Sequence, residues 1–420
     1  MIGALLNTRK RKDRWWRFHV LREAFVHAQM SDMEGKALDR AFRRLGYGRA
    51  PDGLLSFWRA LVDIGADRQA ILSREHLTRL ERQAGELQPE LLPPAGWLDL
   101  SRLCIAIGLF QPARVLREAG LGRMLLDVGH RSATLEQLTA CCYVSLERDD
   151  HESSMRFLDR MEQAGCQDKW LFQAAWFVKL LSGQRVKEVS GPGRFGTRED
   201  EEFGRFVRDQ QIAVVGPVAS NVVQGEEIDR HDVIVKFGYR GGSGGREPET
   251  QGRRLDISYY NNTQAEQLAK SSYDKVLSEI RWGVCNNRKG RSHFPADYPG
   301  LRQVASLQWL MTDTHLNAGP NAIVDLLRFG PGNIKVFNTD MMLSSGRFAG
   351  YKPEGDKPID YTRSFIKTHD PILQYQIMRR LWSVGYVEGD LRFEFVMKMG
   401  VREYLEELQK AYGADTRALI

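Results

Sequence analysis

The sequence has little cysteine and no Cys-x-x-Cys pair. Five cysteines occur in 420 residues, so neither a disulfide framework nor a structural zinc site is expected. Four of them lie in apolar stretches of the first half, where buried free thiols are usual. The five are Cys104, Cys141, Cys142, Cys166 and Cys285. We therefore expect a reducing, cytoplasmic location.

Long hydrophobic runs are also absent. No stretch of about 18 apolar residues occurs, so we expect no transmembrane helix. Residues 1–18, MIGALLNTRKRKDRWWRF, have too short an apolar part, with the charges on the wrong side, for a signal peptide. Residues 9–18 fit either a membrane-surface segment, with Trp15 and Trp16 among the headgroups, or an amphipathic helix packed on the protein. The expected location is thus cytoplasmic, with peripheral association with the inner membrane as an option.

The charge balance is mildly basic. Sixty Lys and Arg residues against 54 Asp and Glu give a formal charge of +6. Such a surplus suits anionic ligands such as nucleotides, or an anionic membrane surface, without proving either. We do not expect nucleic acid as a partner.

The most informative stretch is residues 211–237, QIAVVGPVASNVVQGEEIDRHDVIVKF. Residues 212–215 have the length and β-branched content of a buried parallel strand. Gly216 at its end would let a ligand approach the backbone closely. In the turn that follows, Ser220, Asn221 and backbone N–H groups could cradle a phosphate. This turn carries neither a Gly-x-Gly-x-x-Gly fingerprint nor a P-loop, which excludes the two commonest nucleotide motifs at this point.

The same stretch resembles the large sialyl motif of glycosyltransferase family 29, the eukaryotic-type sialyltransferases. Residues 214–216 read VVG, and residues 225–238 read GEEIDRHDVIVKFG, against the family's VVG and GxEIDxHDxVxRxN. The family's Gly-x-[RK]-x-Asp segment is matched by residues 252–256. The small sialyl motif is matched by residues 319–322, GPNA, a following helix, and a strand that ends in residues 338–340, NTD.

The last family motif is matched by His369, which precedes Asp370 and Pro371 at the expected start of a helix. The sequence also departs from the family. Pro217 and Gly238 stand where the family has Asn, residues 321–323 replace its Ser/Thr-x-Gly, and Gln374 replaces a Glu. The paired cysteines of the secretory enzymes are missing.

The resemblance implies a Rossmann-like domain that uses a CMP-activated sugar as substrate and no separate cofactor. His369 is the candidate general base, because histidine titrates near neutral pH, with an N-cap or core residue as the alternative. Asp232 is either structural or a nucleophile in a retaining transfer. The candidate donor-binding residues are Gly216, Ser220, Asn221, Gly238, His315, Pro320, Asn321 and Asp340.

No metal is expected, because the sequence has no Asp-x-Asp pair. Lys236, Arg253 and Arg254 are candidate charge partners for the phosphate, or else solvated surface cations. The glycine-rich residues 241–245 form either a loop that closes over the donor or an ordinary surface loop.

The two halves of the chain differ in the secondary structure that their sequence patterns predict. Residues 1–195 have helical periodicity, with segments at 100–116, 138–158 and 171–189 that suggest either tetratricopeptide-like hairpins or a plain helical domain. Residues 190–193 and the charged residues 198–202 are typical of a linker. Residues 205–420 alternate between strand and helix patterns, which predicts an α/β domain with a mostly parallel, Rossmann-like sheet. The strands are expected at 211–215, 233–237, 256–260, 304–311 and 334–338.

We therefore expect a glycosyltransferase that moves an acidic keto-sugar, sialic acid or Kdo, to a glycan hydroxyl in surface-polysaccharide synthesis. The acceptor is a glycan or a lipid-linked glycan, and the N-terminal helices could contact a membrane or a protein partner. Inversion at the anomeric carbon is favoured over retention. The alternative is a non-catalytic scaffold, with partner-binding helical repeats and a degenerate nucleotide-binding domain.

Overall fold

The computed structural model divides the chain into two compact units. The helical unit comprises Met1–Arg148, Asp360–Ile372 and Gly400–Ile420, and the sheet unit comprises Asp149–Ile359 and Leu373–Met399. These boundaries differ from the predicted division between residues 195 and 205. The residues that the structure describes are 2–30, 34–67, 73–126, 133–184, 197–242, 247–311, 314–348, 351 and 361–413, so the predicted linker at 190–193 lies outside them.

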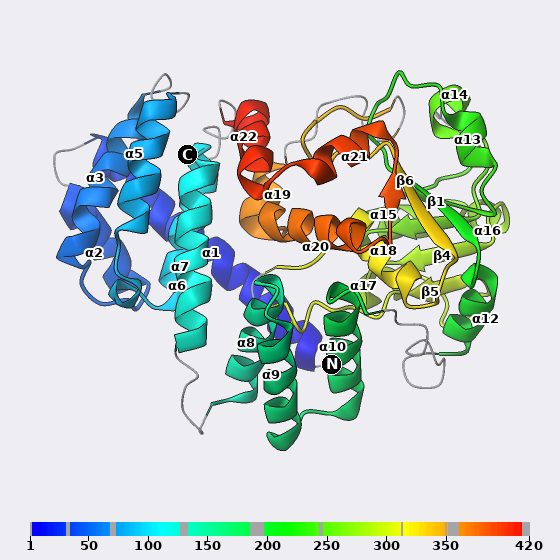
Figure 1. The fold of residues 1–420 in the computed structure, drawn as a ribbon, viewed down its shortest axis with the longest axis horizontal. Helices are drawn as coiled ribbons and strands as arrows, with labels where there is room; N and C mark the ends of the chain where they lie inside the picture. The colour runs from blue at the N-terminus through cyan, green and yellow to red at the C-terminus, as the bar shows by residue number, and fades with distance from the viewer. Residues whose placement is uncertain are drawn as a thin grey trace. The chain divides into compact units, whose positions relative to one another are not determined.

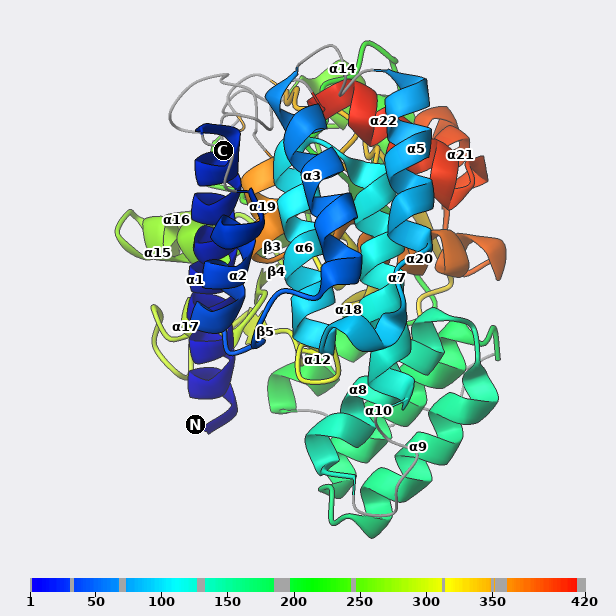
Figure 2. The same ribbon diagram turned by 90° about the vertical axis from the view of Figure 1, so that its left-hand side faces the viewer.

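In its described residues, the regular structure of the helical unit is entirely helical. Every residue from 96 to 107 is buried, because helix α6 is mostly apolar and its buried charges, Asp99 and Arg102, pair with each other at 2.7 Å. Gly108, with φ of 93°, ends α6 in the left-handed conformation, and α7 packs beside it (Figure 2). The elements are α1 (Ile2–Met30), α2 (Glu34–Arg44), α3 (Asp52–Ala66), α5 (Arg74–Gly85), η1 (Pro89–Leu91), α6 (Pro94–Ile107), α7 (Phe110–Leu126), α8 (Leu135–Glu147), α19 (Thr362–Lys367) and α22 (Val401–Tyr412).

The predicted helical segments are confirmed as helices where they are described. Residues 100–116 join α6 to α7, and residues 138–158 join α8 to α9. Residues 171–181 lie in α10, and residues 185–189 are outside the described part. Because α8 belongs to the helical unit while α9 and α10 belong to the sheet unit, these helices are divided between two packing units. A plain helical arrangement accommodates this division more readily than one continuous repeat array.

The sheet unit contains a seven-stranded parallel sheet with the order β5-β4-β3-β2-β1-β6-β7 (Figure 1). The strands are β1 (Gln211–Val215), β2 (Val233–Phe237), β3 (Ile257–Tyr260), β4 (Trp282–Cys285), β5 (Leu301–Gln303), β6 (Asn333–Phe337) and β7 (Glu388–Gly389). The helices are α9 (His151–Gln163), α10 (Asp168–Leu181), α12 (Arg198–Val207), α13 (Gly225–Asp229), α14 (Pro248–Gln251), α15 (Asn262–Ala269), α16 (Tyr273–Ser278), α17 (Arg288–Arg291), α18 (Ala318–Leu327) and α21 (Leu391–Lys398). Helix α20 (Pro371–Ser383) begins in the helical unit and continues in the sheet unit.

The predicted α/β fold class is confirmed, and the strand positions are confirmed in part. β1 and β2 have the predicted bounds, and β3 and β6 begin or end within one residue of them. The predicted strand at 304–311 is wrong, because the strand of this region, β5, covers only residues 301–303. β4 and β7 were not predicted. β7 pairs with Lys335 and Val336 of β6. It has only two residues, and a strand of that length is too short to show a hydrophobic pattern in the sequence.

The charged residues 198–202 form the first half of α12 rather than a linker. Thr197 caps this helix in a reciprocal capping box with Asp200. Asp200 also pairs with the buried Arg302 of β5, which binds Asp325 of α18 as well. Burial alone would lower the pKa of Arg302, but Asp325 and Asp200 raise it above its usual value. The network therefore ties two helices to the sheet through fully paired charges.

Candidate active site at the carboxyl edge of the sheet

The strand order reverses direction at β1. From β1 the chain passes outward through β2, β3, β4 and β5, and then returns to place β6 on the other side of β1. In open parallel sheets, ligands bind outside the carboxyl ends of the strands at such a switch point. The segments that follow β1 and β6, residues 216–224 and 338–344, therefore define the candidate site. We call this side of the sheet the carboxyl edge and the opposite side the amino edge.

Gly216 joins the ends of β1 and β6. Its N–H donates to Phe337 O at 2.8 Å. A Cβ atom on Gly216 would lie 2.2 Å from Thr339 Oγ1 and 2.4 Å from the carbonyl oxygen of Asn338. Glycine is required here because two strand ends approach each other, which differs from the predicted approach of a ligand.

The turn after Gly216 is held partly by its own side chains. Ser220 Oγ accepts a hydrogen bond from the N–H of Val222 at 3.1 Å, while Asn221 is exposed. Both residues lie at the carboxyl edge, and their contact with a phosphate stays a prediction. The structure shows Ser220 organising the turn.

Asn338 fixes three neighbouring segments at the end of β6. Its side-chain oxygen accepts from Gln224 Nε2 at 2.9 Å, and its side-chain nitrogen donates to Thr250 O at 2.9 Å. Its N–H donates to Asp390 Oδ2 at 2.7 Å. Asn338 is buried and has a positive φ of 50°, a conformation that asparagine tolerates better than most residues. The backbone of the site is thus set by a buried polar network.

Asp340 is a buried carboxylate with one unused oxygen. Only 2% of the residue is exposed. Oδ2 accepts from Arg392 at 2.8 Å and from Ser344 Oγ at 2.5 Å. Oδ1 has no hydrogen-bond partner within the described residues. A buried carboxylate oxygen ordinarily binds a donor, so this atom is available for a ligand or water at the switch point.

Two methionines after Asp340 have strained backbones. Met341 and Met342 are buried and have φ of 52° and 71°. Non-glycine residues rarely adopt such angles, and clusters of them are most often found at functional sites. The strained residues Met341 and Met342 therefore follow directly after the carboxylate that has the unused oxygen.

The amino end of α18 faces the same edge, because α18 leads into the parallel strand β6 and runs opposite to it. Asn317 caps the helix by accepting from Ala318 N at 2.8 Å, and its amide nitrogen contacts Met342 Sδ at 3.5 Å. Among the described residues, nothing would lie within 4 Å of a Cβ on Gly319, so they leave the first turn of α18 open at this point. His315, Pro320 and Asn321 are therefore brought to the carboxyl edge with Asp340, and their contact with the donor stays a prediction.

Gln374 explains one departure from the family motif. Its side-chain oxygen accepts from Asn317 N at 2.8 Å, and its side-chain nitrogen donates to His315 O at 3.0 Å. A glutamate could accept the first bond but, when ionised, could not donate the second. The amide thus positions the segment before α18.

Gly238 ends β2 at the carboxyl edge with φ of 61°. Its N–H donates to Tyr259 O at 2.9 Å, and an added Cβ would lie 2.4 Å from Gln264 Nε2. The position is therefore covered by α15. The structure gives a packing reason for glycine where the family has asparagine.

Asp232 lies at the amino edge, just before β2. Its Oδ2 accepts from the N–H of Gln211, the first residue of β1, at 2.9 Å, and its side chain is exposed. This is the end of the strands opposite to the switch point. The structural role that we considered for Asp232 fits this position, and the nucleophile role does not.

The rest of the large-motif match is also structural. Asp229 accepts from the N–H groups of Arg253 and Arg254, each at 2.9 Å. The guanidinium of Arg254 donates to the carbonyl oxygens of Asp229, His231 and Asp232. Lys236 is buried and donates to Gly252 O at 2.8 Å. Lys236 and Arg254 are therefore engaged within the protein, contrary to their suggested use as phosphate partners, although Arg254 is exposed, as Arg253 is.

His369 belongs to the helical unit and is partly exposed. Its N–H donates to Ser364 O at 2.9 Å, just after α19. The next residue, Asp370, caps α20 by accepting from Ile372 N at 2.9 Å, which confirms the predicted helix start. The structure thus places His369 in a different unit from Asp340, and its role as base stays a prediction.

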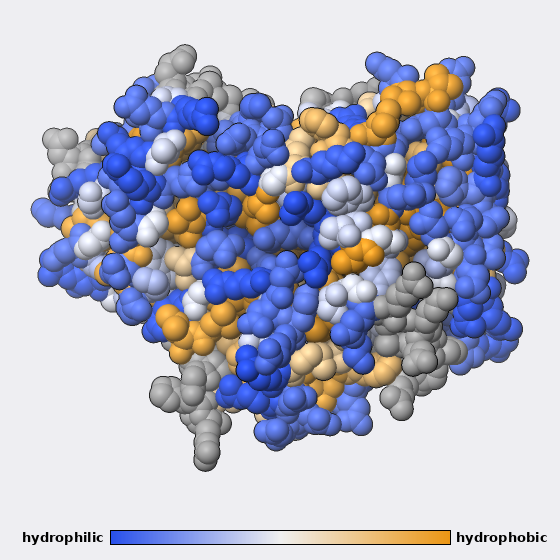
Figure 3. Space-filling model, in the orientation of Figure 1, coloured by the Kyte–Doolittle hydropathy of each residue, from blue (hydrophilic) through white to orange (hydrophobic). Residues whose placement is uncertain are grey.

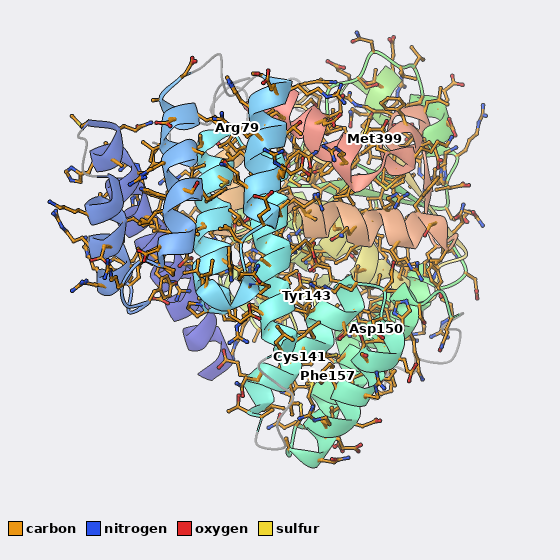
Figure 4. The ribbon with its side chains drawn as sticks, turned by 60° about the vertical axis from the view of Figure 1, so that its left-hand side comes forward. Arg79, Cys141, Tyr143, Asp150, Phe157 and Met399 are labelled. Atoms are coloured by element: carbon orange, nitrogen blue, oxygen red, sulfur yellow. The ribbon has the colours of Figure 1, made fainter. Side chains whose placement is uncertain are left out.

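A buried ion cluster secures the chain beside His369. Arg117 of α7 pairs with both Asp370 and Glu147, and the two carboxylates raise its pKa above the usual value against the opposing effect of burial. Tyr143 lies on α8 one turn before Glu147 (Figure 4), and burial together with Glu147 raises its pKa. The position of Asp370 is therefore determined by paired charges.

Several residues of the site were missed by sequence reasoning. Gln224 and Arg392 carry no local pattern that distinguishes them from surface residues, and Asn338 was matched to the small motif without a role. Asp390 was detectable as an N-cap, since it precedes an apolar helix and accepts from Phe393 N at 2.9 Å.

Among the described residues, no group of three or more His, Cys, Asp or Glu side chains could hold a metal ion. Within the same residues, no helix is long and apolar enough to cross a membrane.

The described fold and site define a Rossmann-like α/β protein with a candidate ligand site at its switch point. No protein-family model matches the chain. No curated protein matches it either. Among solved structures, the chain is similar to a mammalian sialyltransferase in complex with Gal-β-1-3GalNAc-ortho-nitrophenol. The two sequences are 12% identical, the match covers 64% of this chain and 94% of that chain, and the TM-score is 0.31. A second mammalian sialyltransferase structure has 13% identity, coverages of 51% and 83%, and a TM-score of 0.29. Likenesses of this extent leave the function to be argued from the chain's own residues.

Proposed function

We propose that the protein is a glycosyltransferase that transfers an acidic keto-sugar, sialic acid or Kdo, from a CMP-activated donor to a glycan hydroxyl in surface-polysaccharide synthesis. The observation that carries the proposal is the position of Asp340. Its unused buried oxygen, the strained segment after it and the open first turn of α18 meet at the switch point. The ordered resemblance to the sialyl motifs supports the choice of CMP.

In this proposal, the first turn of α18 holds the phosphate of the donor. The helix dipole and the N–H of Gly319 favour an anion there, whereas the N–H of Ala318 is bound by Asn317 and Pro320 has none. Gly319 leaves room for the phosphate, because no described atom lies within 4 Å of where its Cβ would be. The free oxygen of Asp340 would accept a hydroxyl or amino hydrogen of the donor.

His369 is proposed as the general base. It would take the proton of the acceptor hydroxyl while that oxygen attacks the anomeric carbon of the sugar. The bond from the anomeric carbon to the phosphate oxygen breaks, and CMP leaves with the electron pair. A single displacement of this kind inverts the anomeric configuration, which fits the amino-edge position of Asp232.

Calorimetric titration tests the ligand class. CMP should bind, whereas UDP, GDP and NAD should bind at least about tenfold more weakly, which corresponds to about 1.4 kcal/mol. CMP release from CMP-sialic acid and from CMP-Kdo, with and without a glycan acceptor, then identifies the sugar. If CMP does not bind, the proposal fails.

A non-catalytic scaffold is the second candidate, and the engaged motif residues favour it. Lys236 and Arg254 are used internally, and Gln264 covers Gly238. A scaffold would bind CMP weakly or not at all and would release none from either donor. The same titration and release assays therefore separate the two candidates.

A further inference from the structure

A strip of exposed hydrophobic side chains lies beside the candidate site. Val222 and Val223 are 57% and 75% exposed on the turn after β1, and Leu391 and Phe395 are 88% and 66% exposed on α21. Figure 3 shows a band of hydrophobic residues at the upper right, over this turn and α21. We call these four residues the apolar strip. Single exposed apolar residues are ordinary, whereas a group of them indicates an interaction surface.

The two parts of the strip are joined by Arg392. Its guanidinium donates to Ala219 O at 3.2 Å in the turn and to Asp340 at 2.8 Å. The start of α21 is capped by Asp390, which also binds Asn338. The strip is therefore held by the same residues that build the candidate site.

The exposed charges of α21 are positive, whereas Glu226 and Glu227 of α13 are exposed just after the turn. On α21, Arg392 and Lys398 share the exposed face with Leu391 and Phe395. Arg379 is also exposed and donates to Met397 O at 3.3 Å, at the end of α21. The only acidic residue of α21 is Glu394, whose two carboxylate oxygens accept from Trp382 Nε1. An exposed face that combines apolar tips with cations is complementary to an anionic lipid surface.

We infer that the apolar strip docks on an anionic membrane surface, with Val223, Leu391 and Phe395 inserted among the lipids and the cations of α21 at the phosphates. This surface belongs to the sheet unit, whereas Trp15 and Trp16 belong to the helical unit. The inference does not depend on the proposed transfer reaction. It would bring the carboxyl edge of the sheet to the membrane, where lipid-linked glycans are found.

Vesicle co-sedimentation of the full chain tests the inference. We expect binding to vesicles of phosphatidylcholine with about 30% phosphatidylglycerol and much weaker binding to phosphatidylcholine alone. The double variant Val223→Ser/Leu391→Ser should bind the anionic vesicles at least about tenfold more weakly, because two inserted side chains are lost. Lys398→Glu should weaken binding to anionic vesicles by about fivefold, an effect that salt removes.

Two control variants locate the surface. Leu135→Ser removes an exposed hydrophobic of the helical unit and should leave vesicle binding unchanged. Trp16→Ser tests the N-terminal segment, and a loss of binding with Trp16→Ser but not with the strip variant would overturn the inference. Absence of binding to anionic vesicles would overturn it too. So would a dimer, detected by light scattering, that the strip variant converts to monomer, because a second copy would then cover the strip.

Discussion

The two edges of the sheet use their polar side chains in opposite ways. At the amino edge, the side chains of Asp229, Asp232 and Arg254 are bound to neighbouring backbone groups. At the carboxyl edge, Asp340 keeps a buried oxygen without a partner among the described residues, and Met341 and Met342 are strained. The charged residues of the large-motif match, which is the easiest motif to recognise in the sequence, therefore stabilise the framework of the sheet. We expect the chemistry at the carboxyl edge, where the sequence pattern is harder to recognise.

The largest effect is expected from His369→Ala, which tests the proposed general base. Loss of a general base should lower the rate of transfer by about 10²–10⁴-fold. CMP affinity should stay within a few-fold, because the proposed phosphate contacts are in the sheet unit. Steady-state kinetics and titration calorimetry measure the two quantities. The exposed histidine variant His27→Ala is the control, and more than about a tenth of wild-type turnover in His369→Ala would remove the base assignment.

A matched pair of variants compares the edges directly. Asp340→Asn and Asp232→Asn make the same isosteric change, one at each edge. We expect Asp340→Asn to weaken donor binding or transfer by about 10–100-fold, because a hydrogen bond to a buried charged acceptor is replaced. Asp232→Asn should retain transfer within about twofold. An equal loss of transfer in both variants would contradict the assignment of the site to the carboxyl edge alone.

Arg254→Ala should act on stability rather than on ligand binding. Arg254 donates to three carbonyl oxygens and contacts Asp256, so its removal should lower the free energy of unfolding by about 2–3 kcal/mol. Urea denaturation of the folded chain measures this change. CMP affinity of the folded variant should equal that of the wild type, and a tenfold weaker affinity with unchanged stability would make Arg254 a ligand contact.

No covalent sugar adduct is expected when the donor is supplied without acceptor. The carboxylate of Asp232 is at the amino edge, so it is not available to attack a sugar at the switch point. Intact-protein mass spectrometry should show the unmodified mass. An added mass of one sugar that disappears in Asp232→Asn would move the chemistry to the amino edge.

The smallest effect is expected from metal removal. Transfer in EDTA should equal transfer in untreated buffer, because helix N-termini can stabilise a departing nucleoside monophosphate without a metal ion. An activity that falls in EDTA and returns with Mg²⁺ or Mn²⁺ would show that the carboxyl edge needs a cation to hold its anionic ligand.

Local patterns predicted the framework of the sheet but not the network of its site. β1 and β2 were found because they are short, apolar and β-branched, and the start of α20 was found because Asp370 and Pro371 suit a first helical turn. The contacts of Asn338 and Arg392 join segments that are far apart in sequence, so no local pattern could reveal them.

Glycine roles also required the structure. Gly216 was expected to admit a ligand, but its neighbours are Thr339 and Asn338. A glycine at the end of a strand indicates that other atoms pass close to its backbone. Whether those atoms belong to a ligand or to a neighbouring strand depends on the order of the strands in the sheet, which the sequence does not show. The same holds for Asp232, whose partner is the first residue of the adjacent strand.

Hydrogen–deuterium exchange with and without CMP tests the central claim most directly, because it reports on both edges in one experiment. The account predicts slower exchange in residues 216–224, 314–321 and 338–344 when CMP is bound. Residues 229–232 and 252–256, at the amino edge, should exchange at the same rate in both states. Slower exchange at the amino edge with none at the carboxyl edge would contradict the assignment of the site.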